Sequence, residues 1–260
     1  MWDTGDRSTC AVELRCRQWR IQGQVQGVGF RPFVHRLATR LGLAGTVRND
    51  LSGVTIRAYG PPKRLDEFAV RLRQEAPALA RIDRMLQTLD RPASDIPSGF
   101  HIIASSHDST ERGRVTIDAA VCQECVRELF DPADRRYRHG LINCTACGPR
   151  FTIVRDLPYD RPRTTMAGFA MCEPCAAEYK NPSNRRFHAQ PTCCPKCGPR
   201  IVLTDGAGRP WIGDPFQAAA RLLAADGILA MKGLGGYHLV VRADRESAVA
   251  RLRRTKHRDH

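Results

Sequence analysis

Hydrophobic residues in the first hundred positions follow two different periods. Polar and apolar side chains alternate from Arg15 to Val25, which is typical of a half-buried strand, whereas later apolar residues recur every three to four positions, as in a helix. The pattern predicts six elements in the order strand, helix, strand, strand, helix, strand, over residues 15–25, 32–41, 45–49, 54–59, 65–72 and 81–89. Residues 100–105 are a further strand candidate. This βαββαβ order predicts a ferredoxin-like α+β domain over residues 11–106, with helices on one face of an antiparallel sheet.

The pattern changes after Pro210. Residues 216–223 have helical spacing, and Ile228–Met231 predicts a short buried strand. Lys232 then stands at the mouth of a glycine-rich segment that ends at His238, which predicts either a phosphate-cradling loop or a plain structural turn. Residues 245–258 alternate apolar and basic side chains as a helix does, and the sequence ends at His260 with no terminating signal. We therefore expect residues 212–260 to be the truncated start of an α/β domain of a longer protein.

The composition narrows the class of protein. The chain has 260 residues, of which 42% are apolar, as is ordinary for a globular protein. No apolar run approaches the roughly 18–20 residues of a membrane span, and the first residues lack the apolar core of a signal peptide. Eleven cysteines without such a signal indicate a reducing compartment. We therefore expect a cytoplasmic protein with no membrane contact.

The net charge of +14 attracts polyanions, since lysine and arginine neutralise phosphates. An arginine-rich surface, or a docking site for small phosphorylated substrates, accounts for the charge equally well. The one long basic run lies near the end, between Arg251 and Arg258. The balance is against nucleic acid as the natural partner.

Cysteines form a duplicated pattern in the middle of the chain. Two Cys-x-x-Cys pairs, separated by 18 residues, recur after an offset of 50 residues, and the eight positions are Cys122, Cys125, Cys144, Cys147, Cys172, Cys175, Cys194 and Cys197. We call residues 122–147 the first cysteine copy and residues 172–197 the second. The spacing fits structural zinc sites with four thiolates, in a tandem module over residues 112–207. Pairing within each copy is the simplest assignment, and an interleaved pairing stays open.

The remaining cysteines and nearby histidines have less specific interpretations. The register of the repeat favours Cys194 over Cys193 as the ligand, so we read Cys193 as a spare thiol. We read Cys10 and Cys16, which lie outside the repeat, in the same way. His139 and His188 are read as surface residues or as supports of the metal ligands. A redox role for the Cys-x-x-Cys pairs is the weaker alternative.

A glycine-bearing turn follows the first predicted strand. Its backbone N–H groups, the following helix N-terminus and the guanidinium of Arg31 suit a small anion, although an ordinary strand–helix connection has a similar sequence. Gly23–Arg31 resembles the acylphosphatase signature, and Gly45–Asn49 followed by Gly53 resembles its second motif. The resemblance implies that Asn49 orients the attacking water and that the phosphate is held by Gln26, Gly27, Val28, Gly29, Phe30 and Arg31. Thr46 stands where free acylphosphatases usually carry an aromatic residue, which argues against a stand-alone enzyme.

The combination of these motifs resembles the HypF-type carbamoyltransferases of nickel–iron hydrogenase maturation. The resemblance implies that carbamoyl phosphate is hydrolysed at the Arg31/Asn49 site, and that two zinc ions have a structural role. It also implies a YrdC-like domain, here incomplete, in which Lys232, Lys256 and Arg258 are candidate nucleotide-binding residues. In the complete protein, carbamate would react with ATP and Mg²⁺ to form carbamoyl adenylate. A further domain would transfer the carbamoyl group to a cysteine of the partner HypE, for synthesis of cyanide ligands.

The sequence therefore predicts carbamoyl-phosphate hydrolysis without complete carbamoyl transfer. Two other functions stay open at this point. One is a zinc-ribbon nucleic-acid binder with a non-catalytic ferredoxin-like domain, supported by the charge and by the pairs Arg135-Arg136 and Arg185-Arg186. The other is a general acylphosphatase.

Overall fold

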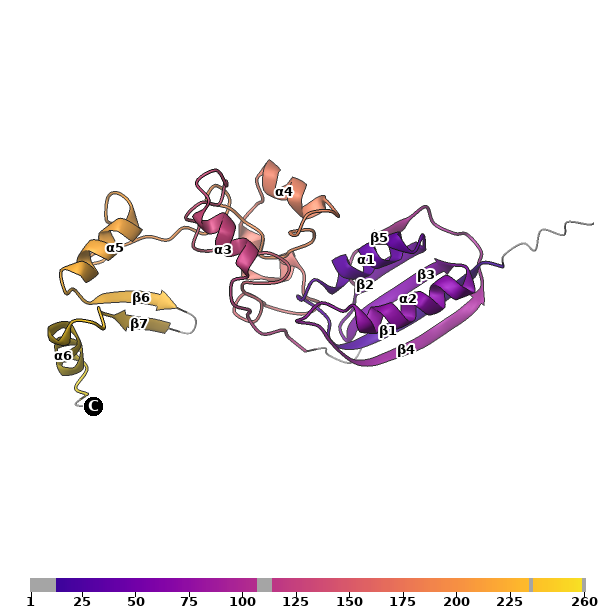
Figure 1. The fold of residues 1–260 in the computed structure, drawn as a ribbon, viewed down its shortest axis with the longest axis horizontal. Coiled ribbons are helices and arrows are strands. Elements are labelled where there is room, and N and C mark those ends of the chain that lie inside the picture. Colours follow the sequence, from indigo (N-terminus) through magenta and orange to yellow (C-terminus); the bar gives the residue numbers. More distant parts are fainter. Residues whose placement is uncertain (1–12, 107–113, 234–235, 259–260) are drawn as a thin grey trace, which may run out of the picture. The chain divides into compact units, whose positions relative to one another are not determined.

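The computed structural model describes residues 13–106, 114–233 and 236–258 (Figure 1). It divides the chain into two compact units, Met1–Gly198 and Pro199–His260, which are described separately below. Cys10 lies outside the described residues. Among the residues described, no helix has the length and apolar character needed to span a bilayer.

The first unit begins with a five-stranded sheet. Its strands are β1 (Arg15–Gln24), β2 (Ala44–Asn49), β3 (Gly53–Gly60), β4 (Arg81–Pro92) and β5 (Phe100–Ile102), in the order β4-β1-β3-β2-β5. The pairs β1–β4, β1–β3 and β2–β3 are antiparallel, and β5 adds to the edge of the sheet parallel to β2. This confirms the predicted ferredoxin-like fold. The last predicted strand is shorter than expected, because it ends at Ile102 instead of residue 105.

Two helices, α1 (Phe30–Arg40) and α2 (Pro62–Gln74), lie on one face of this sheet (Figure 1). The alternation along β1 places Trp19 and Ile21 on that face, where both are almost fully buried. The apolar side of each helix packs on them, and Trp19 meets Phe68 of α2 edge to face with ring centroids 5.6 Å apart. The resulting core fixes the start of α1 beside the end of β2, which is where the candidate site lies.

The two cysteine copies have the same local structure. The first contains α3 (Gln123–Phe130), which begins immediately after Cys122, and the second contains α4 (Glu173–Lys180), which begins immediately after Cys172. Between the copies, residues 148–171 form what we call the connecting segment, with the short 3-10 helices η1 (Arg161–Arg163) and η2 (Thr165–Gly168). The hydrophobic cluster of the first copy consists mostly of its own cysteines, with Ile142 as the main addition. Such a small core depends on a metal for its stability.

The second unit contains α5 (Pro215–Ala224), β6 (Leu229–Gly233), β7 (Gly236–Val240) and α6 (Glu246–Thr255). Both predicted helices are present. The prediction of a buried strand was wrong in one respect, because Met231 of β6 is 52% exposed: the described part of this unit pairs β6 with a single other strand. Of the two alternatives for the glycine-rich segment, the structure favours the plain structural turn, because Lys232 pairs with Tyr237 in an antiparallel hairpin.

Candidate functional site

The turn between β1 and α1 has the geometry of an anion site. Gly27 and Gly29 have φ angles of +72° and +74°, in the left-handed region that glycine adopts without strain. Helix α1 begins directly after Gly29, and its first turn contains no acidic residue; within the described part of the chain, no side chain caps its first N–H groups. Arg31, in that first turn, is 8% exposed. Free backbone N–H groups, the helix dipole and a buried guanidinium together favour a bound phosphate.

Asn49 lies at the end of β2 and is completely buried. Its Nδ2 donates a hydrogen bond of 3.3 Å to the carbonyl oxygen of Tyr159, and Arg31 Nη2 contacts the same oxygen at 3.4 Å. The structure thus brings together the two residues that the sequence proposed as catalytic. Asn49 Oδ1 has no hydrogen-bond partner among the described residues. A buried acceptor without a partner suits a water molecule that must be oriented for attack.

Gln26 has a role that the sequence did not predict for its side chain. Its Nε2 donates hydrogen bonds to the carbonyl oxygens of Asp50 at 2.6 Å and Gly53 at 2.8 Å. Its Oε1 accepts a hydrogen bond of 2.8 Å from the backbone N–H of Tyr159. Gln26 therefore joins the phosphate turn to the β2–β3 turn and to the connecting segment.

The connecting segment covers the site. Arg150 is almost fully buried, and it donates hydrogen bonds to the carbonyl oxygens of Gly27 in the phosphate turn and of Cys144 in the first cysteine copy. Asp160 forms a salt bridge of 2.7 Å with Arg31. Neither residue was predicted from the sequence. Arg150 had one signal, since Gly148-Pro149-Arg150 recurs as Gly198-Pro199-Arg200.

Two titratable side chains beside Arg31 are held neutral at neutral pH. Burial, and then the charge of Arg31, lower the pKa of His188 to about 4. Burial raises the pKa of Tyr159 to about 12. His188 lines the cavity beside the phosphate turn, and because it is neutral the positive charge there comes from arginine.

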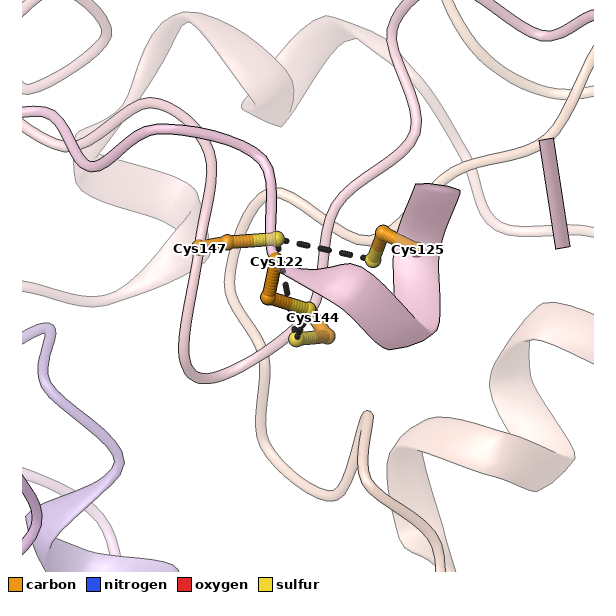
Figure 2. Close-up of side chains that lie close together, drawn as sticks. All are labelled: Cys122, Cys125, Cys144 and Cys147. Carbon is orange, nitrogen blue, oxygen red and sulfur yellow. Dashed lines mark hydrogen bonds between the residues drawn. The ribbon is translucent and has the colours of Figure 1, made fainter. Parts of the chain in front are cut away.

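The eight predicted metal ligands form two groups. In the first copy, the Sγ atoms of Cys122 and Cys144 are 3.7 Å apart, those of Cys144 and Cys147 are 3.7 Å apart, and those of Cys147 and Cys125 are 3.5 Å apart (Figure 2). The corresponding distances in the second copy are 3.6–3.7 Å. Each group draws all four cysteines from one copy, as in the sequential pairing.

These distances fit zinc. Four thiolates at about 2.3 Å from a tetrahedral Zn²⁺ lie about 3.8 Å from one another, whereas a disulfide needs about 2.05 Å between sulfurs. Because four cysteines complete a tetrahedron, such a site leaves no open position for a substrate. Cys193 stays outside the groups, and its Sγ lies 3.5 Å from Nε2 of His139, which is buried. The expectation of a surface position for His139 was therefore wrong.

Arginines of each cysteine copy contact the cysteine and glutamate side chains of the other copy, an arrangement that we call the arginine exchange. Arg185 of the second copy donates to Cys125 Sγ at 3.1 Å and to Glu128 of the first copy at 2.7 Å, and Arg186 bonds the same carboxylate. Burial alone would raise the pKa of Glu128, but the hydrogen bonds and charges of these two arginines outweigh it and lower the pKa from 4.5 to about 2. This arginine pair thus places positive charge beside the thiols of the first copy.

The reverse exchange uses the equivalent residues. Arg135 of the first copy donates to Cys175 Sγ at 3.3 Å and lies 2.6 Å from Glu178, and Arg136, which is 1% exposed, lies 2.5 Å from the same carboxylate. The two arginine pairs that supported a nucleic-acid binder are thus engaged within the protein. They give that alternative no support.

The candidate nucleotide residues lie in the second unit. Lys232 is in β6, Lys256 ends α6, and Arg258 follows it; all three side chains are exposed. They stay candidates from the sequence resemblance.

Known proteins match the chain module by module. A profile of the acylphosphatase family matches residues 17–102, a profile of the HypF finger matches residues 121–154 and 171–204, and a profile described as telomere recombination (Sua5/YciO/YrdC) matches residues 221–260. An acylphosphatase of Salinibacter ruber is 42% identical over 82 residues, which cover 31% of this chain and 81% of that enzyme.

Other relatives match nearly the whole chain. Carbamoyltransferase HypF2 of Cupriavidus necator is 52% identical over 256 residues, which cover 97% of this chain and 31% of the relative. A crystal structure of full-length HypF in the phosphate- and nucleotide-bound form has a TM-score of 0.88 at 43% identity, over 95% of this chain and 32% of that chain.

Fold and site together define an acylphosphatase-like domain joined to two four-cysteine fingers and a YrdC-like region. The chain belongs to the HypF carbamoyltransferase family. It spans about a third of the length of the curated HypF relatives that it matches.

Proposed function

We propose that the first unit of this chain hydrolyses carbamoyl phosphate to carbamate and phosphate. The observation that carries the proposal is the convergence of Arg31, the Gly27–Phe30 turn and Asn49, whose buried Oδ1 has no partner among the described residues. The acylphosphatase match over residues 17–102 and the membership of the HypF family support this substrate.

The chemistry follows from the charges at the site. The guanidinium of Arg31 and the N–H groups at the start of α1 bind the phosphoryl oxygens and stabilise the charge that develops on them. Asn49 Oδ1 accepts a hydrogen bond from a water molecule, which orients a lone pair of the water oxygen toward phosphorus. The bond between phosphorus and the bridging oxygen breaks, carbamate leaves with its electron pair, and the water proton is released to solvent. No covalent intermediate is needed.

We further propose that each four-cysteine group binds one structural zinc ion. The sulfur–sulfur distances and the arginine exchange support this assignment. When bound, zinc would stabilise the two copies, and through Arg150 and the connecting segment it would hold the cover of the phosphate site in place. Eight thiolates that stay available for metal support a reducing compartment, which we propose to be the cytoplasm.

The wider role belongs to the longer relatives. We propose that the carbamate is used for ATP- and Mg²⁺-dependent formation of carbamoyl adenylate by a complete YrdC-like domain. The carbamoyl group would then be transferred to a cysteine of a HypE-type protein during hydrogenase maturation. Full-length HypF has been crystallised in a phosphate- and nucleotide-bound form, which supports sites for both ligands in the family.

The test is phosphate release from carbamoyl phosphate and acetyl phosphate by the zinc-loaded chain and by Asn49→Ala. Loss of one preorganised contact should lower kcat on the order of 10²–10³-fold. Asn143→Ala is a matched control, because Asn143 is also a buried asparagine with an unpartnered Oδ1 but lies in the first cysteine copy. Equal losses in both variants, with native circular dichroism, would count against a catalytic Asn49. No hydrolysis by the folded, zinc-loaded chain would refute the proposed function.

A further inference from the structure

Asp160 neutralises the arginine that would hold the phosphate. Arg31 Nη2 lies 2.7 Å from Asp160 Oδ1, and the Arg31 side chain is 9% exposed. The other carboxylate oxygen of Asp160 accepts a hydrogen bond from Ser105 Oγ. A carboxylate that is held through both of its oxygens therefore occupies the guanidinium that an anionic substrate needs.

The backbone around Asp160 is fixed on both sides. On one side, the N–H of Tyr159 donates to Gln26 Oε1 at 2.8 Å. On the other, the N–H of Arg161 donates to Gln190 Oε1 at 2.8 Å, and its guanidinium donates to the Gln190 carbonyl oxygen at 2.7 Å. The protein's own contacts thus hold the carboxylate over Arg31.

The space left beside Arg31 is small. The cavity lined by the phosphate turn, Tyr159 and His188 has a volume of about 20 Å³, which is about the room that one water molecule needs. Arg31 itself lines this cavity, so an anion that enters it meets a guanidinium already paired with Asp160.

We propose that Asp160 is an internal competitor for the phosphate and sets the affinity of this site for phosphate and acyl phosphates. The inference rests on the proposed function. In the free protein, the carboxylate keeps the guanidinium of Arg31 hydrogen-bonded and oriented. Substrate binding then replaces one anion by another on the same arginine. The free energy of binding therefore reflects only the difference between the two ion pairs. After hydrolysis, the returning carboxylate displaces the product phosphate, which limits product inhibition.

The test uses inorganic phosphate as the probe and the full zinc-loaded chain as the protein. Asp160→Asn removes the competing charge and keeps the shape of the side chain. Its dissociation constant for phosphate, measured by calorimetry, should fall roughly 10- to 100-fold, the range that one hydrogen bond to a charged group spans. The inhibition constant of phosphate against acyl-phosphate hydrolysis should fall by the same factor.

Two variants serve as controls. Asp156 is in the same segment, its side chain is 61% exposed, and it lies 3.0 Å from Arg163, so Asp156→Asn should bind phosphate like the wild type. Asp160→Glu keeps the charge and should also bind phosphate weakly. The proposal is overturned if Asp160→Asn binds phosphate no more tightly than the wild type, or if Asp160→Glu tightens binding as much as Asp160→Asn.

A variant that does not fold is recognised by circular dichroism. In that case Ser105→Ala gives the answer, because it removes the hydrogen bond that holds Asp160 in place. It should tighten phosphate binding by up to about 10-fold, the lower end of what a hydrogen bond to a charged group contributes, and no tightening overturns the proposal. Since phosphate binding is measured without turnover, a chain that binds phosphate as expected but hydrolyses no acyl phosphate refutes the proposed function alone.

Discussion

Glu128 is the carboxylate on which both arginines of the opposite copy converge, so its removal measures the strength of the exchange. Glu128→Gln removes the charge and keeps the size of the side chain. It leaves Arg185 and Arg186 close together without the carboxylate that they share, and Arg185 also loses the partner that orients it toward Cys125. We expect the zinc-loaded first unit to lose stability.

The magnitude follows from the pKa of Glu128. A lowering from 4.5 to about 2 corresponds to at most about 3 kcal/mol, at about 1.4 kcal/mol per pH unit, because water screens part of a side chain that is 24% exposed. This stabilisation is fully present above pH 4.5 and is lost as the pH falls toward 2. Zinc thiolates take up protons and release the metal in acid, so the comparison belongs at neutral pH.

The assay is thermal unfolding of wild type and variant in the presence of zinc. In a domain of this size, about 1 kcal/mol shifts the melting temperature by about 2–4 °C, so Glu128→Gln should lower it by up to about 6–12 °C. Glu124→Gln is the matched control, because Glu124 is on the same helix, its side chain is 59% exposed and it pairs with Arg127. An exposed pair of this kind contributes about 0–1 kcal/mol.

The two variants should therefore differ in stability. Equal melting temperatures for Glu128→Gln and Glu124→Gln would show that the exchange contributes no more than an exposed ion pair, and would refute its stabilising role. A second readout is the rate of zinc transfer to a chromogenic chelator, which Glu128→Gln should increase and Glu124→Gln should leave unchanged.

Two further predictions concern the phosphate turn and the metal. Gly29→Ala forces a side chain into a φ of +74° and brings its Cβ to 3.2 Å from Thr145 Cβ. We expect a loss of about 1–2 kcal/mol in stability, seen as a lower melting temperature, and weaker phosphate binding by calorimetry. A variant equal to the wild type in both measurements would contradict the role of the turn. Zinc removal by a strong chelator should expose residues 114–198 to limited proteolysis while residues 15–102 stay protected by their own core, and equal protection of both parts would show that the cysteine copies fold without metal.

The local parts of the site could be predicted from the sequence because neighbouring residues determine them. The alternation around Trp19 and Ile21 determines which face of β1 is buried, and the glycines at 27 and 29 permit the turn that starts α1. Regular cysteine spacing likewise indicates two metal sites. In each case the residues that form the sequence pattern are the ones that form the structure, and they lie within a few tens of positions of one another.

Long-range contacts could not be predicted in the same way. Asp160 lies 129 positions after Arg31, and nothing in its own neighbourhood indicates which of the many arginines it meets. The duplicated arginine pairs were visible, but exposed basic residues and arginines that cross to the other copy look identical in sequence. The sequence left two alternatives at Lys232, because glycines favour a hairpin turn as readily as a phosphate loop, and the hairpin pairing is the one observed.

The arginine exchange has a consequence for how this region can change over generations. Deleting one copy would remove the counterions of the other and leave a half-buried carboxylate, Glu128 or Glu178, beside a negatively charged metal site without its arginines. A substitution in the arginine pair of one copy therefore destabilises the metal site of the other copy. Each copy contains a complete set of four cysteines. The smallest part of this region that could be inherited or transplanted as a working module is nevertheless the two cysteine copies together.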